Sequence, residues 1–590
     1  MSMPQREPTA YRVGDLSIDL GTRQVCRAGQ ALPLPRLSYD LLIALVRGAP
    51  NVLTPDQLMA AVWSGRVVNE ETVAKRVELV REALGDDSRD SRYIALVRGH
   101  GYRLTAEVET LRAAAPAASP VPSRAQLALA VLPLEDLSPG ASEGYFAAGL
   151  HDALITDLSK ARALRVISRT STLPYQKSSL SLPAIAGELG VDLVIEGSVL
   201  RAGDRVRITV QLVAANDSHV WAESYDGDLR DVLRLQSEVA RAVTRAVKVT
   251  LTPDESQRMT TLRQVNTESY DLYLKGRDFL DRMTPAGFEA GLALLHRATQ
   301  LDPSDPLPYS RLALAYNFIG HTPGSSKSSF PRGAAAALQA LGLDEGIAEA
   351  HLALAEARLY FHWDWPEADR SFRQALEINP SLAAAHAHYA WLHLIHGRVE
   401  RAFEESELAV QLDPRQPLWI SWHGWLHLWR ENFVAAIRDQ RIALALDPNH
   451  PVAHFVLAQA LSALGRHEEA IAAATKAATT AARWSWALGH CLAYAGRTGE
   501  ARIFAAELAR NDPPDPWALA EVHAALGDRD AALGWLEAGY ESRRDWMPWM
   551  KANYFFRSLM DEPRFREVVR RLDLPGGQSG GGLAIEGESS

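Results

Sequence analysis

The chain has 590 residues, more than a single hydrophobic core supports, so we expect three or more domains. Its 62 basic and 72 acidic residues give a net charge of −10, which excludes a whole-chain polyanion binder but not a local basic patch. Cys26 and Cys491 are its two cysteines, which excludes a disulfide framework and a paired-thiolate metal site and favours a reducing compartment.

The composition of the two ends of the chain and of its apolar runs indicates where in the cell the protein is expected. The first ten residues are polar and contain two prolines, unlike the apolar core of a signal peptide. The most apolar later run, 127–134, is far shorter than the roughly 20 residues that span a bilayer. We therefore expect a cytoplasmic protein with no membrane partner. The Gly/Ser-rich tail, 576–590, is expected to be disordered.

Residues 1–106 form the first predicted domain. Short alternating stretches predict strands, and three helical patterns follow at 38–47, 54–63 and 69–84. Two further strands flank Arg98-Gly99-His100-Gly101, whose glycines predict a hairpin tip. Strands, three helices and a terminal hairpin are the parts of a winged helix, in which the third helix enters the DNA major groove.

The helix at 69–84 has two distinct faces. Its apolar stripe, Val73, Val77, Val80 and Leu84, should face a core. On a winged-helix interpretation, the opposite arc offers DNA a set of candidate side chains, and so does the hairpin: Thr72, Lys75, Arg76 and Leu79 on the helix, and Arg98, His100 and Arg103 on or beside the wing. The alternative is a solvated helix face and an ordinary surface hairpin. Charge does not decide, because residues 1–106 hold 14 basic and 12 acidic side chains.

Three stretches of this domain carry a family resemblance: Val67-Val68-Asn69-Glu70-Glu71-Thr72-Val73, then Arg81-Glu82-Ala83-Leu84-Gly85-Asp86-Asp87, then Val97-Arg98-Gly99-His100-Gly101-Tyr102-Arg103. They resemble the OmpR/PhoB-type winged-helix output domain, over nearly all of residues 12–105. The resemblance implies sequence-specific binding of double-stranded DNA, and Arg81 joins the candidates for DNA contact. No phosphoacceptor receiver domain precedes it in this sequence, so aspartyl phosphorylation is not the expected switch. Glu78 and Glu82 are unfavourable near phosphates, so affinity is expected to be modest or to need a homodimer.

Residues 107–125 are rich in Ala, Pro and Ser and are predicted to be a flexible linker. Residues 126–252 then alternate strands and helices, which predicts a mixed α/β domain. Ala130-Val131-Leu132-Pro133, Tyr145 to Leu150 and Val166 to Ser171 are similar to the TolB amino-terminal-like domain, which implies an interaction or sensing module. For the charged residues of this domain, surface charge and intradomain ion pairs are the favoured interpretation over a polar ligand site.

Residues 253–575 contain a repeat. Gly346, Pro380, Pro414 and Pro448 are spaced by 34 residues, and Ala368, Ala402, Ala436 and Ala470 share one register at the same step. This period predicts an all-α solenoid of paired helices, about eight in number, capped by a terminal helix at 563–572. The units look like tetratricopeptide repeats, whose first helices line a concave groove that grips peptides or partner helices.

Within that resemblance, Trp391 and Trp425 occupy equivalent first-helix positions, and Trp429 and Arg430 follow one turn later. Tryptophans with an arginine are typical of an interaction hot spot, and inter-helix packing is an equally good interpretation. His393/His396 and His423/His427 have helical spacings that suit a metal. Without a carboxylate or thiolate at the same spacing, satisfied or exposed histidines are favoured, and no metal is expected.

These features together predict a DNA-binding transcriptional regulator whose α/β and repeat domains bind an effector or a protein or peptide partner. The alternative is a tetratricopeptide interaction scaffold whose winged helix makes protein contacts. No phosphate-binding loop and no nucleophile elbow occurs, so neither an enzyme nor a cofactor is expected. Operator, effector and the direction of regulation are not encoded in these patterns.

Overall fold

The structure is a computed structural model. It describes residues 10–19, 24–27, 30–32, 34–49, 51–62, 70–87, 91–97, 99–106, 108–111, 126–139, 144–260 and 263–574. Arg98, most of the expected linker and the tail at 576–590 lie outside these residues. The chain divides into two compact units, Met1–Ser123 and Arg124–Ser590, which are described separately.

The N-terminal unit contains a five-stranded antiparallel sheet in the order β4-β3-β2-β1-β7. Its strands are β1 (Ala10–Val13), β2 (Leu16–Asp19), β3 (Gln24–Arg27), β4 (Gln30–Ala31) and β7 (Val108–Leu111). The last strand lies inside the segment assigned to the linker, and it pairs with β1 from Val13↔Val108 to Ala10↔Leu111. Four residues of alternating pattern were too short a signal to separate from the Ala/Pro-rich sequence that follows.

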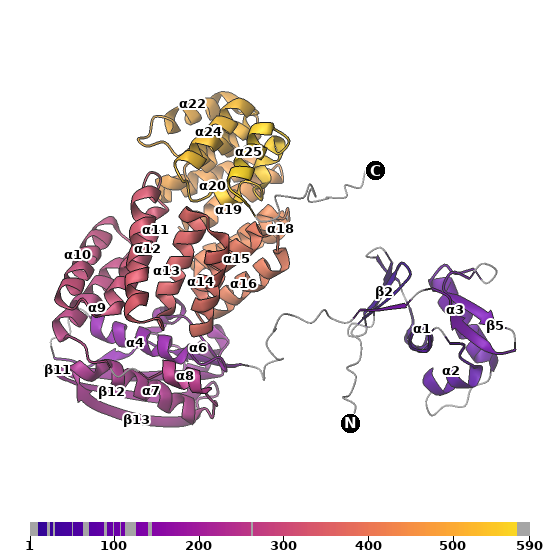
Figure 1. Ribbon diagram of the computed structural model, residues 1–590, viewed down its shortest axis with the longest axis horizontal. Coiled ribbons are helices and arrows are strands. Elements are labelled where there is room, and N and C mark those ends of the chain that lie inside the picture. Colours follow the sequence, from indigo (N-terminus) through magenta and orange to yellow (C-terminus); the bar gives the residue numbers. More distant parts are fainter. Residues whose placement is uncertain are drawn as a thin grey trace. The chain divides into compact units, whose positions relative to one another are not determined.

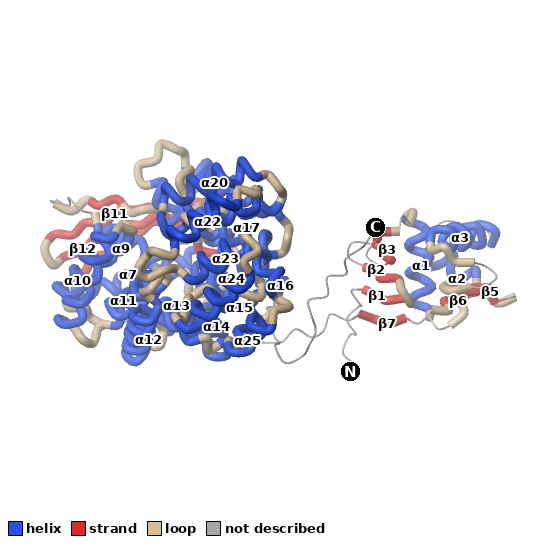
Figure 2. Tube along the Cα trace, turned by 90° about the horizontal axis from the view of Figure 1, so that it is seen from above, coloured by secondary structure: helices blue, strands red, loops and turns tan. Residues whose placement is uncertain are grey.

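Three helices pack beside this sheet: α1 (Arg36–Gly48), α2 (Pro55–Val62) and α3 (Glu70–Ala83). Helix α2 begins in a reciprocal cap, where the Thr54 Oγ1 accepts from the Gln57 N–H and the Gln57 Oε1 accepts from the Thr54 N–H. The stripe Val73, Val77, Val80 and Leu84 is buried in the unit's own core, as predicted. The hairpin of β5 (Ile94–Val97) and β6 (Gly101–Leu104) lies at the far end of the helices from the sheet (Figure 2).

The second unit opens with a mixed α/β domain. Parallel strands β10 (Leu164–Val166), β8 (Leu127–Val131) and β11 (Leu193–Ala202) lie side by side, and the antiparallel strands β12 (Arg205–Ala214) and β13 (His219–Asp228) follow. Short β9 (Glu135–Asp136) pairs with β11. Strand β8 alternates: Leu129 and Val131 join one core, while Ala128 and Ala130 join another on the opposite face. Both faces of the sheet are therefore covered.

Helices complete the two layers. The helices α4 (Tyr145–Leu158) and α7 (Val232–Ala246) belong to the larger core, and α6 (Leu182–Leu189) lies on the other side. The short helix α5 (Arg169–Thr172) contacts α4 and β8. The short α8 (Pro253–Arg258) leads into the repeats and starts with a capping box between Thr252 and Glu255. The expected α/β domain is confirmed.

Sixteen helices, α9 to α24, follow as eight antiparallel pairs within the described residues, and the array stands over the α/β domain (Figure 1). They are α9 (Thr267–Asp281), α10 (Pro285–Leu301), α11 (Pro306–Gly320), α12 (Ser326–Leu343), α13 (Ala348–Ala357), α14 (Trp365–Ile378), α15 (Ala383–Ile395), α16 (Val399–Leu412), α17 (Pro417–Trp429), α18 (Phe433–Leu446), α19 (Pro451–Ala463), α20 (His467–Thr480), α21 (Trp486–Tyr494), α22 (Thr498–Leu508), α23 (Pro516–Ala525) and α24 (Arg529–Glu541). Helix α25 (Pro563–Arg571) ends the stack.

The 34-residue period has two physical causes. The alanines in register, Ala368, Ala402, Ala436 and Ala470, are all fully buried, because only a small side chain fits where paired helices touch. The residue before Pro380 and the residue before Pro448 each cap an inter-repeat turn: the Asn379 Oδ1 accepts from the Ser381 N–H at 3.1 Å, and the Asp447 Oδ1 accepts from the Asn449 N–H at 3.0 Å. The repeat length is therefore set by one close contact and one turn per unit.

Two of these turns also attach the α/β domain to the repeats. Ser171 on α5 donates to the Asp413 carboxylate at 2.6 Å and accepts from the Arg415 N–H at 2.8 Å. Nearby, the Ser168 N–H donates to the Leu412 carbonyl at 2.8 Å, and the Val166 N–H donates to the Ser381 hydroxyl at 3.2 Å. The α/β domain and the repeats are thus joined by buried hydrogen bonds rather than by a loose tether.

Candidate nucleic-acid interface

Helix α3 exposes one face and buries the other. Lys75 is exposed, Thr72 and Leu79 are half-buried, and all three lie opposite the Val73–Leu84 stripe. Lys75 Nζ lies 2.6 Å from a Glu78 carboxylate oxygen, and this ion pair raises the pKa of the lysine. The outward face therefore carries the positive charge of Lys75, which Glu78 on the same helix partly neutralises.

Two arginines of α3 are held more closely by the domain than the sequence indicated. Arg76 is half-buried and donates to the Ser38 hydroxyl on α1 at 3.4 Å. Arg81 donates to the Ile94 carbonyl at 2.8 Å, which ties α3 to the first strand of the hairpin. Arg81 therefore positions the hairpin in this structure. The neighbouring Asp86 carboxylate accepts from three successive backbone N–H groups, those of Arg92, Tyr93 and Ile94.

The hairpin is fixed by backbone pairing at its base. Tyr102 exchanges both backbone hydrogen bonds with Leu53, at 2.8 and 3.0 Å. Gly101 has a φ of +128° and passes so close to this partner that a Cβ would lie 2.1 Å from the Leu53 oxygen, so no other residue fits there. His100 and Arg103 are exposed beside the tip, whereas Arg98 is outside the described residues.

The N-terminal unit thus has three packed helices, of which the third exposes one face, and a short hairpin fixed beside them. This arrangement defines it as a winged-helix DNA-binding domain. Comparison with protein families agrees, because residues 29–104 match the family described as "Transcriptional regulatory protein, C terminal". Residues 125–242 match "HilA/YgeH-like transcriptional regulator, second domain", and residues 442–472 match "Tetratricopeptide repeat". The chain therefore combines an OmpR/PhoB-type reader, a HilA-like regulator domain and interaction repeats.

Three curated relatives share parts of this organisation. A Rhizobium meliloti protein named "Putative adenylate cyclase 3" is 34% identical over 245 residues, 41% of this chain and 42% of that protein. Transcriptional regulator HilA of Salmonella typhimurium is 24% identical over 408 residues, 67% of this chain and 70% of that protein. DNA-binding response regulator MtrA of Mycolicibacterium smegmatis is 34% identical over 92 residues, 15% of this chain and 40% of that protein. The chain thus spans less than half of the first and third relatives.

The expected groove tryptophans are not exposed. Trp391, Trp425 and Trp429 are 6%, 3% and 7% exposed, and they contact one another edge to face at ring-centroid distances of 5.3 to 5.8 Å. The three side chains are therefore packed between helices, as the packing interpretation expects, and their part in partner binding stays a prediction. Of the four candidates, Arg430 alone is exposed.

The chain's own C-terminal segment, residues 543–559, packs against two of these tryptophans, Trp391 and Trp425. The Trp549 indole N–H donates to the Trp391 carbonyl at 3.1 Å, and its ring packs against Trp391. Trp546 packs against Trp425 at 4.9 Å and also contacts Trp484 and Trp517. One segment thus touches the first helices of several repeats, the surface that the tetratricopeptide resemblance assigns to a bound peptide.

Buried polar contacts hold this segment in place. His321 Nδ1 lies 2.6 Å from the Asp545 carboxylate, and burial lowers the pKa of His321 to about 3, so the imidazole is neutral at physiological pH. Asn553 donates to the Glu521 carboxyl at 3.2 Å, and Arg544 pairs with Asp515 at 2.9 Å. These contacts come from His321 at the end of α11, from α23 and from the loop before α23, so the segment bridges repeats that are far apart in the sequence.

The described residues contain no helix long and apolar enough to cross a membrane. On α15, two histidines have polar partners: His386 Nδ1 lies 2.5 Å from a Glu405 carboxylate oxygen, and His388 Nδ1 lies 2.7 Å from the Tyr360 hydroxyl. His423 and His427 differ, because a carboxylate from the neighbouring helix lies between them.

Proposed function

We propose that this chain is a cytoplasmic transcriptional regulator that reads duplex DNA with α3 and the β5–β6 hairpin. The observation that carries this proposal is the geometry of α3, whose apolar stripe is fully packed while Thr72, Lys75 and Leu79 face outward beside the wing. Lys75 and Arg76 bind phosphates or guanine edges, and Leu79 contacts a thymine methyl. His100 and Arg103, with Arg98, contact the adjacent minor groove and its phosphates.

The matched family and the relatives HilA and MtrA support regulation of transcription, since both are named as regulators. Homodimerisation on DNA is part of the proposal, because a single small reader with Glu78 and Glu82 on its outer face binds weakly.

The second unit is proposed to receive the signal. The match to a HilA-like second domain and the resemblance to the TolB amino-terminal-like domain both support a sensing or interaction role for the α/β domain. A protein or peptide partner of the repeats has two routes: it displaces the segment 543–559 from the first helices, or it binds the open surface around Arg430. Either event changes how two winged-helix domains pair on DNA. The signal is therefore a shift between conformations of the protein rather than a chemical step.

The test is selection of duplexes from a random pool by the full-length protein, followed by sequencing. The regulator proposal expects an enriched motif of one or two half-sites. Lys75→Ala/Arg76→Ala should lose the enrichment, and Lys476→Ala, a charge change on the exposed surface of α20 in the other unit, should keep it. Failure of the wild-type protein and of fragment 1–123 to bind any duplex at low salt would leave the scaffold alternative.

An enzymatic role rests on the name of the Rhizobium relative, of which 42% is matched. Our proposal expects no nucleotide turnover by the purified chain. Cyclic nucleotide formation from ATP that is lost on substitution within residues 126–252 would contradict it.

A further inference from the structure

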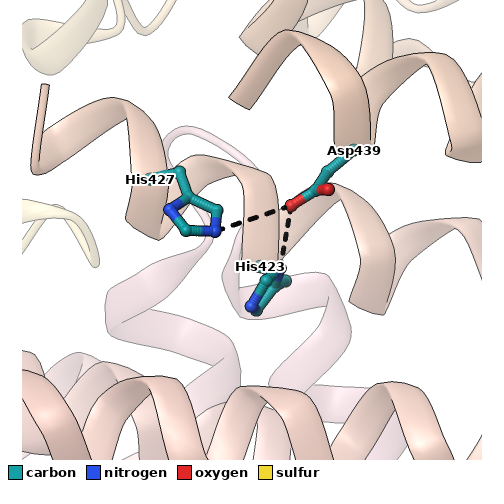
Figure 3. Close-up of side chains that lie close together, drawn as sticks. All are labelled: His423, His427 and Asp439. Carbon is teal, nitrogen blue, oxygen red and sulfur yellow. Dashed lines mark hydrogen bonds and ion pairs between the residues drawn. The ribbon is translucent and has the colours of Figure 1, made fainter. Parts of the chain in front are cut away.

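His423 and His427 lie one turn apart on α17, and Asp439 reaches toward them from α18 (Figure 3). One ligand atom from each residue lies within 4.8 Å of the others. The Asp439 Oδ2 is 2.8 Å from His423 Nδ1 and 3.9 Å from His427 Nε2. The carboxylate whose absence along the helix argued against a metal is thus supplied by the neighbouring helix.

Close packing of the two helices brings Asp439 within reach. Gly424 follows His423 on α17, and a Cβ there would lie 3.0 Å from the Asp439 Cβ and 2.2 Å from the Gln440 Nε2. Any larger residue at position 424 would push the helices apart and withdraw the carboxylate. The juxtaposition is therefore built by the backbone approach of α17 and α18.

The carboxylate is oriented by a second partner. Arg438 donates to the Asp439 Oδ1 from its Nε at 2.8 Å, which leaves Oδ2 directed at the two imidazoles. Hydrogen bonds of this kind orient the ligands in metal sites. Arg438 also brings a positive charge near a cation, but its side chain is 62% exposed, so water screens the repulsion.

The surroundings suit a partly enclosed ion. The side chains of His423, His427 and Asp439 are 13%, 17% and 5% exposed, so water reaches the imidazoles from one side. The Phe403 ring of α16 packs against both, at 5.7 Å from His423 and 4.8 Å from His427. An apolar wall behind the ligands strengthens the attraction of a carboxylate for a cation.

We propose that His423, His427 and Asp439 bind one divalent first-row transition-metal ion, with Zn²⁺ as the representative, and that the ion clamps α17 to α18. Neighbouring ligands of a tetrahedral ion with bonds of about 2.1 Å lie roughly 3.4 Å apart, which falls between the two observed distances. Small rotations of the imidazoles suffice to place both nitrogens. Two imidazoles and one carboxylate select such ions over Mg²⁺ or Ca²⁺, which prefer oxygen ligands. Water completes the coordination.

In the metal-free protein the same atoms form a simple hydrogen bond, in which the His423 Nδ1–H donates to Asp439. On binding, the neutral imidazole carries its proton on Nε2 instead, and Nδ1 becomes a ligand. The ion joins two helices of one repeat, so it should raise the thermal stability of the repeat array. A helix pair stabilised only by the hydrogen bond would show no such response.

The experiment uses full-length protein stripped with a chelator and titrated with Zn²⁺, followed by calorimetry and by thermal unfolding, with Co²⁺ absorption as a second readout. We expect one equivalent to bind, a rise in Tm, and Co²⁺ bands typical of a four- or five-coordinate nitrogen–oxygen site. Mg²⁺ and Ca²⁺ at the same concentrations should give no rise in Tm.

His427→Gln and Asp439→Asn should each weaken Zn²⁺ binding at least about tenfold. His427→Gln is the cleaner variant, because His427 Nε2 is 3.9 Å from Asp439, too far for a hydrogen bond, and its loss leaves the His423–Asp439 bond in place. His219→Gln, at an exposed histidine of β13, is the control and should bind as wild type. Absence of Zn²⁺ binding, or equal binding by wild type and His427→Gln, would overturn the proposal.

Discussion

At the scale of single residues, Glu78 competes with DNA for Lys75. The two side chains lie 2.6 Å apart, and the carboxylate faces the same outward surface as the proposed phosphate contact. Glu78→Gln removes this competitor and a repulsive charge, so we expect it to tighten DNA binding about twofold to fivefold at low salt. Fluorescence anisotropy with a labelled duplex measures the change.

The matched control is Glu500→Gln, which removes an equally exposed carboxylate from α22. It should leave DNA affinity unaltered. Weaker binding by Glu78→Gln would place the DNA surface away from Lys75.

A buried carboxyl predicts a pH dependence of stability. Burial raises the pKa of Glu521 to about 8, from an ordinary value of 4.5. Between these values the folded protein holds a proton that the unfolded chain has released, so stability falls as pH rises and becomes level above about 8. Glu521→Gln keeps hydrogen-bonding capacity toward Asn553 and should flatten this decline.

The measurement is the urea midpoint at pH 6.5 and 8.5 for both proteins. Histidines such as His490, whose pKa burial lowers to about 3 from an ordinary value of 6.5, act in the opposite direction and still contribute near pH 6.5. Their contribution is the same in both proteins, so the difference between wild type and Glu521→Gln isolates Glu521. Equal declines in wild type and Glu521→Gln would show that Glu521 does not hold the proton.

At the scale of elements, the tryptophans of α15 and α17 are structural. Trp391 is buried among four other tryptophan rings and accepts a hydrogen bond from Trp549 at its carbonyl. Trp391→Ala should therefore cost about 3–5 kcal/mol of unfolding free energy, as for a large core aromatic. Chemical denaturation of the full-length protein measures it, with Val434→Ala, at a 73% exposed position, as the control.

The outcome separates two roles for α15. Loss of stability by Trp391→Ala supports a closed groove. Unchanged stability together with loss of a bound partner would restore the open-groove interpretation of Trp391 and Trp425.

The paired helices were predictable because each repeat carries its own local signals, the small alanines that are buried and the Asn-Pro or Asp-Pro turns at Pro380, Pro414 and Pro448. The packing of residues 543–559 against the first helices could not be predicted, because it depends on contacts across more than a hundred residues. In addition, a tryptophan looks the same in the sequence whether it lies in a core or in a hot spot. Asp439 could not be predicted as a partner of His423 for a related reason: spacing along one helix reveals only residues of that helix, and this carboxylate comes from the next one.

In the N-terminal unit, the apolar stripe of α3 predicted which face of the helix is buried. The exposed face could then be predicted as the opposite one. Periodicity could not show that Arg81 turns toward the Ile94 carbonyl, since that depends on where the hairpin lies. The DNA contacts themselves remain predictions.

At the scale of the whole molecule, the α/β domain and the repeats should respond as one body. Ser171 alone makes two of the hydrogen bonds that join them, and burial raises the pKa of its partner Asp413 to about 6. Ser171→Ala leaves that carboxyl without its hydroxyl donor and should cost about 1–3 kcal/mol. Calorimetry should show the shared transition of the second unit lowered, with that of the N-terminal unit unchanged.

Ser328→Ala, at an exposed serine at the start of α12, is the control and should leave both transitions in place. Separate melting of the α/β domain and the repeats in the wild-type protein would show that the interface does not couple them. Coupling matters for function, because a partner on the repeats can then alter the α/β domain that follows the reader.

DNA binding through α3 is the central proposal for this protein, and the salt dependence of that binding tests it most directly. The affinity of the full-length protein for its selected duplex should fall with a log–log slope of roughly −4 to −6 for each bound reader, near −0.9 for each phosphate neutralised. Lys75→Ala/Arg76→Ala should lower the affinity and reduce the slope by about 1 for each charge removed. Binding that is independent of salt, or a double variant with the wild-type slope and affinity, would contradict a DNA-reading role for α3.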